Sequence, residues 1–239
     1  MRTIVWFAYF WTYLVCLIPA MHKAQRFARE GKTAECDAII NYEMPKWAKR
    51  LMKLAGVTVK VEGRENIPDE PVVFVSNHQG YFDIPILLTY LDKPHGLVAK
   101  NDIEKMPLVR SWMKLLGCVF IDRSNARQSL TQLGVAADAL TEQGRSFIIF
   151  PEGTRSRGGP LGDFKSGAFR IATKTGAPIL PICIDGTYRA MEAQGGWIRP
   201  AEVKLTILPP ISTKDMTREE TKLIGEQVRT LINDKISKA

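Results

Sequence analysis

Short apolar, β-branched runs alternate with helical patterns along most of the chain, and this alternation constrains the fold more than any other feature. Seven runs are predicted strands: 57–61, 72–75, 97–99, 118–121, 146–150, 181–184 and 203–208. Helical patterns lie at 84–91, 108–116, 126–143, 164–175 and from Thr217 onward, where Thr217 and Glu220 form a capping-box motif. Such alternation predicts an α/β domain with a central, largely parallel sheet flanked by helices.

The length of 239 residues suits one large domain with a short appendage. We therefore expect an α/β domain over 57–239, preceded by an N-terminal, membrane-associated helical segment over 1–56. With 45% hydrophobic and 24% charged residues, the composition excludes a disordered, collagen-like or polytopic membrane protein. The four cysteines share no metal-ligand spacing, so we expect neither a zinc site nor a disulfide framework.

An uncharged stretch, 4–21, reads IVWFAYFWTYLVCLIPAM. As a helix it would be about 27 Å long, just enough to cross the hydrocarbon core. Its many aromatic residues also suit a shallow insertion into one leaflet. Only Arg2 precedes the stretch, whereas four basic residues follow it, which predicts that the main domain lies on the cytoplasmic face of a membrane.

A second candidate for lipid contact is a basic amphipathic helix over 44–56. One face is apolar (Met44, Trp47, Leu51, Leu54) and the other is basic (Lys46, Lys49, Arg50, Lys53). Taken alone, this pattern is typical of a surface helix packed on a core. Because it follows a membrane segment, we favour docking at the interface, with the lysines near anionic headgroups.

The formal net charge of +8 favours anionic partners: nucleic acid, phosphorylated metabolites or an acidic membrane face. Nucleic acid is disfavoured, because the basic residues gather near the membrane segments or in turns rather than among aromatic residues along a groove.

His78 and Asp83 lie in a polar cluster, 76–83, that directly follows a predicted strand. Ligand-binding loops of open α/β sheets usually occupy this position. A five-residue offset turns about 500° on a helix, so the two side chains face each other only if the segment begins as a turn. Each residue also has an ordinary role open to it, as a loop histidine or a helix N-cap. Together they form a dyad that can deprotonate a substrate hydroxyl.

Three cations, Lys100, Arg123 and Arg155, each follow a predicted strand and could meet around one phosphate. Arg155 belongs to a turn, 150–156, in which a proline and a glycine leave backbone donors and a hydroxyl free to converge on an anion. The alternatives are an ordinary polar turn and a surface pair between Arg123 and Asp122. A further stretch, 177–182, has two prolines among apolar residues and predicts a wall rather than a source of reacting groups.

The order of these blocks resembles the glycerolipid acyltransferase family. The matching blocks are Asn77-His78-x4-Asp83, 117–123, 150–156 and 177–182. The resemblance implies that His78 is the general base and that Asp83 orients it. It also implies a set of acceptor-binding residues: Lys100, Arg123 and Arg155 on the phosphate, with Glu152, Gly153 and Thr154 shaping the site. The family commonly has Ser where Gly80 stands, so a hydroxyl is missing here.

The resemblance further implies acyl transfer from acyl-CoA or acyl-carrier protein to the sn-2 hydroxyl of 1-acyl-glycerol 3-phosphate, giving phosphatidic acid. It implies no covalent acyl-enzyme, no cofactor and no metal, with backbone donors near the dyad stabilising the oxyanion. An acidic carrier protein could dock on the basic face of 44–56. Two alternatives stay open: another acceptor within the family, such as glycerol 3-phosphate or another lysolipid, or a non-catalytic peripheral lipid-binding protein.

Overall fold

The structure, a computed structural model, describes residues 1–91, 95–122 and 124–236. Within these ranges one sheet has seven strands in the order β1-β7-β6-β2-β5-β3-β4. Their bounds are β1 Val57–Glu62, β2 Val73–Ser76, β3 His95–Lys100, β4 Val119–Ile121, β5 Ser146–Ile149, β6 Ile179–Asp185 and β7 Ala201–Ile207. Neighbouring strands are parallel except for β6 and β7. The α/β fold with a largely parallel sheet is therefore confirmed.

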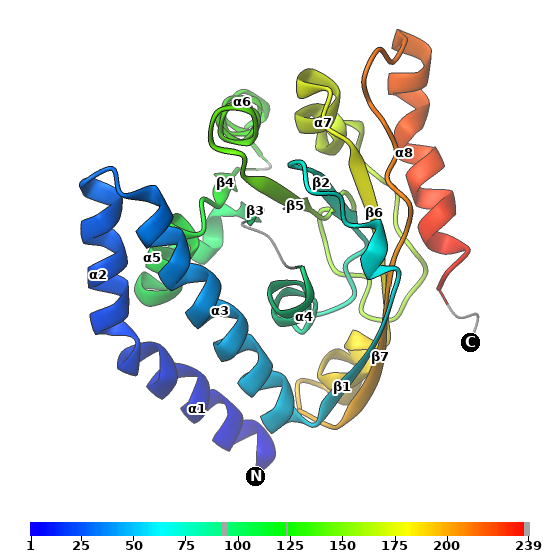
Figure 1. Ribbon diagram of the computed structural model, residues 1–239. Helices are drawn as coiled ribbons and strands as arrows, with labels where there is room; N and C mark the ends of the chain where they lie inside the picture. The colour runs from blue at the N-terminus through cyan, green and yellow to red at the C-terminus, as the bar shows by residue number, and fades with distance from the viewer. Residues whose placement is uncertain (92–94, 123, 237–239) are drawn as a thin grey trace.

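Helices cover both faces of the sheet (Figure 1). Their bounds are α1 Arg2–Cys16, α2 Ile18–Arg29, α3 Thr33–Ala55, α4 Asp83–Tyr90, α5 Pro107–Leu115, α6 Ala126–Gln143, α7 Arg170–Thr175 and α8 Arg218–Asn233. The pattern over 164–175 becomes a 3-10 helix, Ser166–Phe169, followed by α7. The capping box at the start of α8 is present in both directions, because the Thr217 side chain accepts from the Glu220 N–H and the Glu220 carboxylate accepts from the Thr217 N–H.

The central strands bury both of their faces, as parallel strands between two layers of helices must. Val73 and Val75 of β2 belong to the core beneath α6, α7 and α8. Phe74, between them, points the other way into the core shared with α3 and α4. The alternation of side chains along a strand thus divides the interior into two cores, one on each face of the sheet.

The N-terminal apolar stretch differs from the single helix expected over 4–21. It forms α1 and the start of α2, which meet at a 47° bend. The break falls at Leu17, and Pro19 lies in the first turn of α2, where its missing N–H is not needed. Within the described residues no single helix is both long and apolar enough to cross a membrane, although the bent pair meets that condition together.

The helix expected over 44–56 is the second half of the longer α3, which packs against α1, α2 and α4. Met44 and Leu51, on its apolar face, are 3% and 1% exposed, so protein rather than lipid covers that face. The basic side chains of Lys49, Arg50 and Lys53 remain exposed. Because residues 1–56 share one hydrophobic core with the sheet, that core is continuous across residue 56.

Candidate active site

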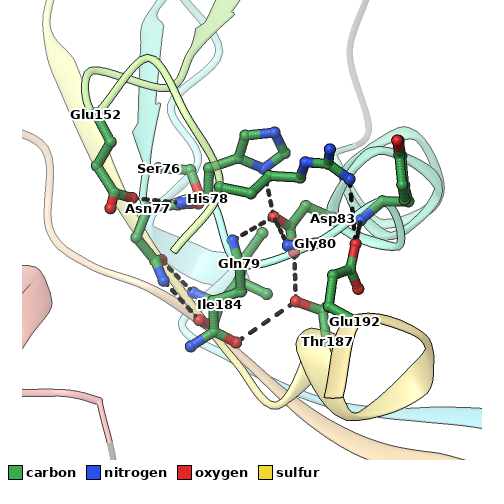
Figure 2. Close-up of polar contacts among 12 residues, drawn as sticks. Ser76, Asn77, His78, Gln79, Gly80, Asp83, Glu152, Ile184, Thr187 and Glu192 are labelled. Carbon is green, nitrogen blue, oxygen red and sulfur yellow. Dashed lines mark hydrogen bonds and ion pairs between the residues drawn. The ribbon is translucent and has the colours of Figure 1, made fainter. Parts of the chain in front are cut away.

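The loop between β2 and α4 brings His78 and Asp83 together. The Asp83 N–H donates to the Gly80 carbonyl at 3.3 Å, which closes a turn just before α4. His78 Nδ1 then lies 2.6 Å from Asp83 Oδ2 (Figure 2). The turn therefore supplies the geometry that a continuous helix over these residues would forbid.

The carboxylate of Asp83 is fully buried and held by four donors. Besides His78, its Oδ2 atom accepts the Gln79 N–H at 2.7 Å and the Gly80 N–H at 3.0 Å. Its Oδ1 atom accepts the Thr187 hydroxyl at 2.5 Å. Asp83 is the first residue of α4 and makes no side-chain cap of that helix. Its oxygens face the loop, where they contact His78, Gln79 and Gly80.

The imidazole of His78 is fixed from two sides. Its ring stacks on Phe150, with centroids 4.2 Å apart and planes inclined by 23°. Because Nδ1 faces a carboxylate, we assign the ring proton to Nδ1, which leaves a lone pair on Nε2. The side chain is 20% exposed, so a substrate can reach it.

Asn77 and Gln79, on either side of His78, anchor the loop to β6 and the turn after it. The Asn77 amide both donates to and accepts from the backbone of Ile184, each at 2.8 Å. Gln79 Oε1 accepts the Gly186 N–H at 2.8 Å. These partners lie 107 residues away in the sequence. Both amides belong to the polar cluster over 76–83, but no sequence signal identified their partners.

Glu152 supports His78 rather than facing open solvent. Its Oε1 atom accepts the His78 N–H at 2.7 Å, and its Oε2 atom accepts the Gly162 N–H at 3.0 Å. Burial raises the pKa of Glu152, and the two N–H donors partly oppose that effect. Gly153 closes the preceding turn at a φ of +71°, and Thr154 is exposed.

Arg155 lies against the dyad loop. Its guanidinium stacks over the Tyr81 ring at 3.7 Å, and its Nη1 atom is 3.3 Å from Glu192 Oε1. Glu192 begins the 3-10 helix η5, Glu192–Gln194, which follows β6 and the 3-10 helix η4, Thr187–Ala190. Thr187 and Glu192 are thus two site residues that the sequence did not indicate.

We expected Lys100, Arg123 and Arg155 to meet around one phosphate, but the structure does not bring Lys100 to this loop. Lys100 ends β3, two strand positions or roughly 10 Å from β2 along the sheet edge. It is exposed and forms an ion pair with Asp102, near Asp122 at the end of β4. Arg123 lies outside the described residues. Of the two candidate cations that the structure describes, Arg155 is the one beside the dyad loop.

Four backbone N–H groups of the dyad loop are already bonded within the protein. The backbone N–H groups of residues 78–81 all donate to carboxylates. Glu152 takes the first, Asp83 the second and third, and Glu192 the fourth. These four groups are occupied, so an oxyanion formed beside His78 needs other donors.

Comparison with known proteins gives one consistent result. A family model described as Acyltransferase matches residues 58–185. The chloroplastic 1-acyl-sn-glycerol-3-phosphate acyltransferase BAT2 of Brassica napus is 38% identical over 167 residues, which is 68% of this chain and 48% of that protein. A Saccharomyces cerevisiae protein named 1-acyl-sn-glycerol-3-phosphate acyltransferase is 32% identical over 77% of this chain and 62% of its own length. The chain thus spans about half to three fifths of these relatives.

A solved structure extends the similarity to nearly the whole chain. The crystal structure of the 1-acyl-sn-glycerophosphate (LPA) acyltransferase PlsC from Thermotoga maritima has a TM-score of 0.80 and 30% sequence identity. The match covers 98% of this chain and 95% of that one, so it includes the N-terminal helices. With the family model over more than half of its length, the chain belongs to the acyltransferase family.

Proposed function

We propose that this protein transfers an acyl group from acyl-CoA or acyl-carrier protein to the sn-2 hydroxyl of 1-acyl-glycerol 3-phosphate, which gives phosphatidic acid. The observation that carries the proposal is the 2.6 Å contact between His78 and a fully buried Asp83 beside Arg155. The names of the relatives support this choice of acceptor.

In the proposed mechanism His78 Nε2 takes the proton of the acceptor hydroxyl as its oxygen attacks the thioester carbonyl. The tetrahedral intermediate collapses with loss of the thiolate, to which the imidazolium returns the proton. Asp83 keeps the Nδ1 proton in place and stabilises the imidazolium. The hydroxyl attacks directly, so no acyl-enzyme forms.

Arg155 is the proposed ligand of the acceptor phosphate. A guanidinium binds phosphate with paired N–H donors, and this one lies over Tyr81 in the loop that carries the base. Its side chain is 22% exposed, so it is accessible to a headgroup. Binding the phosphate here would bring the neighbouring sn-2 hydroxyl close to His78.

We also propose that α1 lies in a membrane interface, with the catalytic domain on the cytoplasmic face. The outward side of α1 is apolar and exposed: Ile4 is 69% exposed, Val5 53%, Phe7 40%, Trp11 42% and Val15 53%. Its opposite side buries Trp6 and Leu14 in the protein. Exposed apolar residues on a helix followed by basic residues suit a shallow lipid contact.

The decisive experiment is transfer of a labelled acyl group to 1-acyl-glycerol 3-phosphate in detergent or liposomes, with acyl-CoA and acyl-carrier protein as separate donors. Wild type should form phosphatidic acid with at least one donor, and His78→Ala and Asp83→Ala should reduce kcat by about a hundredfold or more. As a control, Glu226→Gln on α8, an exposed partner of Arg229, should retain full activity.

Each other result has a definite meaning. Acylation of glycerol 3-phosphate or another lysolipid alone would overturn the acceptor but keep the reaction class. Unchanged activity in His78→Ala would overturn the mechanism. A lack of transfer to any acceptor would favour a non-catalytic lipid-binding protein.

A further inference from the structure

Glu192 is a buried carboxylate at the junction of three segments of the site. Its side chain is 5% exposed. Its Oε1 atom accepts the Tyr81 N–H at 2.8 Å and faces Arg155 Nη1 at 3.3 Å. One oxygen therefore joins the loop that carries the dyad to the guanidinium that we propose binds phosphate (Figure 2).

The second oxygen of Glu192 lies against Gly80. No hydrogen-bond donor within the described ranges reaches Glu192 Oε2, although it is buried. A Cβ atom built on Gly80 would lie 2.4 Å from this oxygen and 2.8 Å from the carboxylate carbon. Any side chain at position 80 must therefore shift this carboxylate, which contacts Tyr81 and Arg155.

The backbone of Gly80 does not itself require glycine. Its φ lies outside the left-handed region that L-residues avoid, unlike that of Gly153. The reason for glycine at position 80 is thus the space that Glu192 occupies. A serine at position 80, as in the family pattern, would therefore clash with the buried Glu192 carboxylate as it stands here.

We infer that Glu192 is a positioning residue that holds Arg155 over Tyr81 for binding of an anionic headgroup, and that Gly80 is the paired position that leaves room for it. A long arginine side chain loses conformational freedom when it binds a ligand. Glu192 fixes Nη1 before the ligand arrives, and the remaining N–H groups of the guanidinium stay available. The inference rests on the proposed function for the identity of that ligand.

The test is a double-mutant cycle with Glu192→Ala, Gly80→Ala and the double variant, supported by Glu192→Gln. We measure kcat and KM for 1-acyl-glycerol 3-phosphate, and its calorimetric Kd in detergent without an acyl donor. Each single alanine variant should raise KM and Kd about tenfold, with kcat changed less than about twofold and KM for the donor unchanged. The double variant should match the single ones, because Gly80 acts through the carboxylate. Glu192→Gln, which retains an acceptor for Tyr81 but loses the charge, should lie between wild type and Glu192→Ala.

Two control variants separate this effect from general damage. Gly134→Ala in α6 introduces the same methyl group where no atom lies within 4 Å. Glu226→Gln removes the charge of another arginine-paired glutamate, with Arg229 at the same 3.3 Å. Both should leave KM and Kd unchanged. Thermal unfolding of every variant should show a single cooperative transition, as expected of a folded protein.

The outcomes distinguish the inference from the proposed function. If wild type forms phosphatidic acid and Glu192→Ala leaves KM and Kd unchanged, the inference is overturned and the proposed function stands. A double variant whose effects multiply, or a loss confined to kcat, would also overturn it. If wild type binds the lysolipid but never acylates it, and Glu192→Ala binds it more weakly, the proposed function is overturned and the inference is supported. Wild type that does not bind the lysolipid at all would overturn both.

Discussion

At the residue scale, the His78–Asp83 dyad depends on side chains that form hydrogen bonds with the main chain rather than with the substrate. Asn77, Gln79 and Asp83 each bond to main-chain groups, and together they hold the loop that carries His78. Stacking of His78 on Phe150 also holds the loop, but these polar contacts fix it to β6 and to the turn after it. Their loss should therefore affect both stability and catalysis.

Asn77→Ala tests this dependence. It leaves the buried N–H and C=O groups of Ile184 without their amide partner, so we expect the free energy of unfolding to fall by about 2 to 4 kcal/mol. We also expect kcat to fall about tenfold as His78 loses its support. Urea titration and steady-state kinetics measure the two effects. The exposed Asn233→Ala on α8 should change neither, and a fully stable Asn77→Ala variant would contradict the account.

At the element scale, β1, β7 and α1 have surface groups outside the candidate site: a set of ion pairs and an exposed cysteine. β1 pairs with β7, and Glu62 bonds at 2.9 Å to Lys60 within β1 and at 2.9 Å to Lys204 across this pair. On α1, Cys16 is exposed while the other three cysteines are buried. Both features yield predictions about single elements.

The Glu62 pair predicts an acid dependence of stability. Hydrogen bonds from Lys204 and Lys60 lower the pKa of Glu62 from 4.5 to about 2. A lowered folded-state pKa gives stability that is fully present above the unfolded value and is lost as pH falls through the folded one. The difference in urea midpoint between wild type and Glu62→Gln should thus shrink from pH 4.5 to about 2, and high salt should reduce it. A difference independent of pH would contradict this role of the ion pairs.

Cysteine labelling tests where α1 lies. In membrane-free buffer at pH 8, a water-soluble maleimide should modify Cys16 alone, because burial raises the pKa of Cys118 and Cys183 to about 12 and also raises that of Cys36. Anionic vesicles should slow the labelling of Cys16 severalfold, since α1 would then contact lipid. A cysteine introduced at Asn233, on the exposed end of α8, should react equally with and without vesicles. Equal labelling of Cys16 under both conditions would contradict the lipid contact of α1.

At the scale of the whole molecule, the N-terminal helices and the sheet form one packed unit. Arg145, just before β5, is 8% exposed and contacts Asp37 of α3 at 2.9 Å. Its other terminal nitrogen donates to the Leu116 carbonyl at 3.0 Å. This partly buried ion pair joins the first 56 residues to the sheet across a long sequence separation.

Asp37→Ala should destabilise the entire fold rather than detach the helices. It leaves a buried guanidinium without its carboxylate, which we expect to cost about 3 kcal/mol. One cooperative transition, at lower urea concentration, should be seen by both circular dichroism and tryptophan fluorescence. Asp138→Ala, which breaks an exposed pair with Lys174, should cost under about 1 kcal/mol. Two separate transitions in Asp37→Ala would show that the helices unfold independently.

The sequence alone predicted the strands and most helices of the α/β domain and singled out His78 and Asp83, because these depend on short-range patterns. It missed the break at Leu17 and the first half of α3. Side-chain periodicity located each strand of the described residues, and a turn before α4 brought His78 to a carboxylate five residues away. The tertiary structure decided the rest. It covered the apolar face of α3 with protein, kept Lys100 away from the loop, and supplied Ile184, Thr187 and Glu192 as partners. These partners lie 104 to 111 residues from the residues they hold. They lie close in space because β6 neighbours β2 in the sheet. Local periodicity cannot specify strand order, because it records which face a residue buries and not which strand lies beside it.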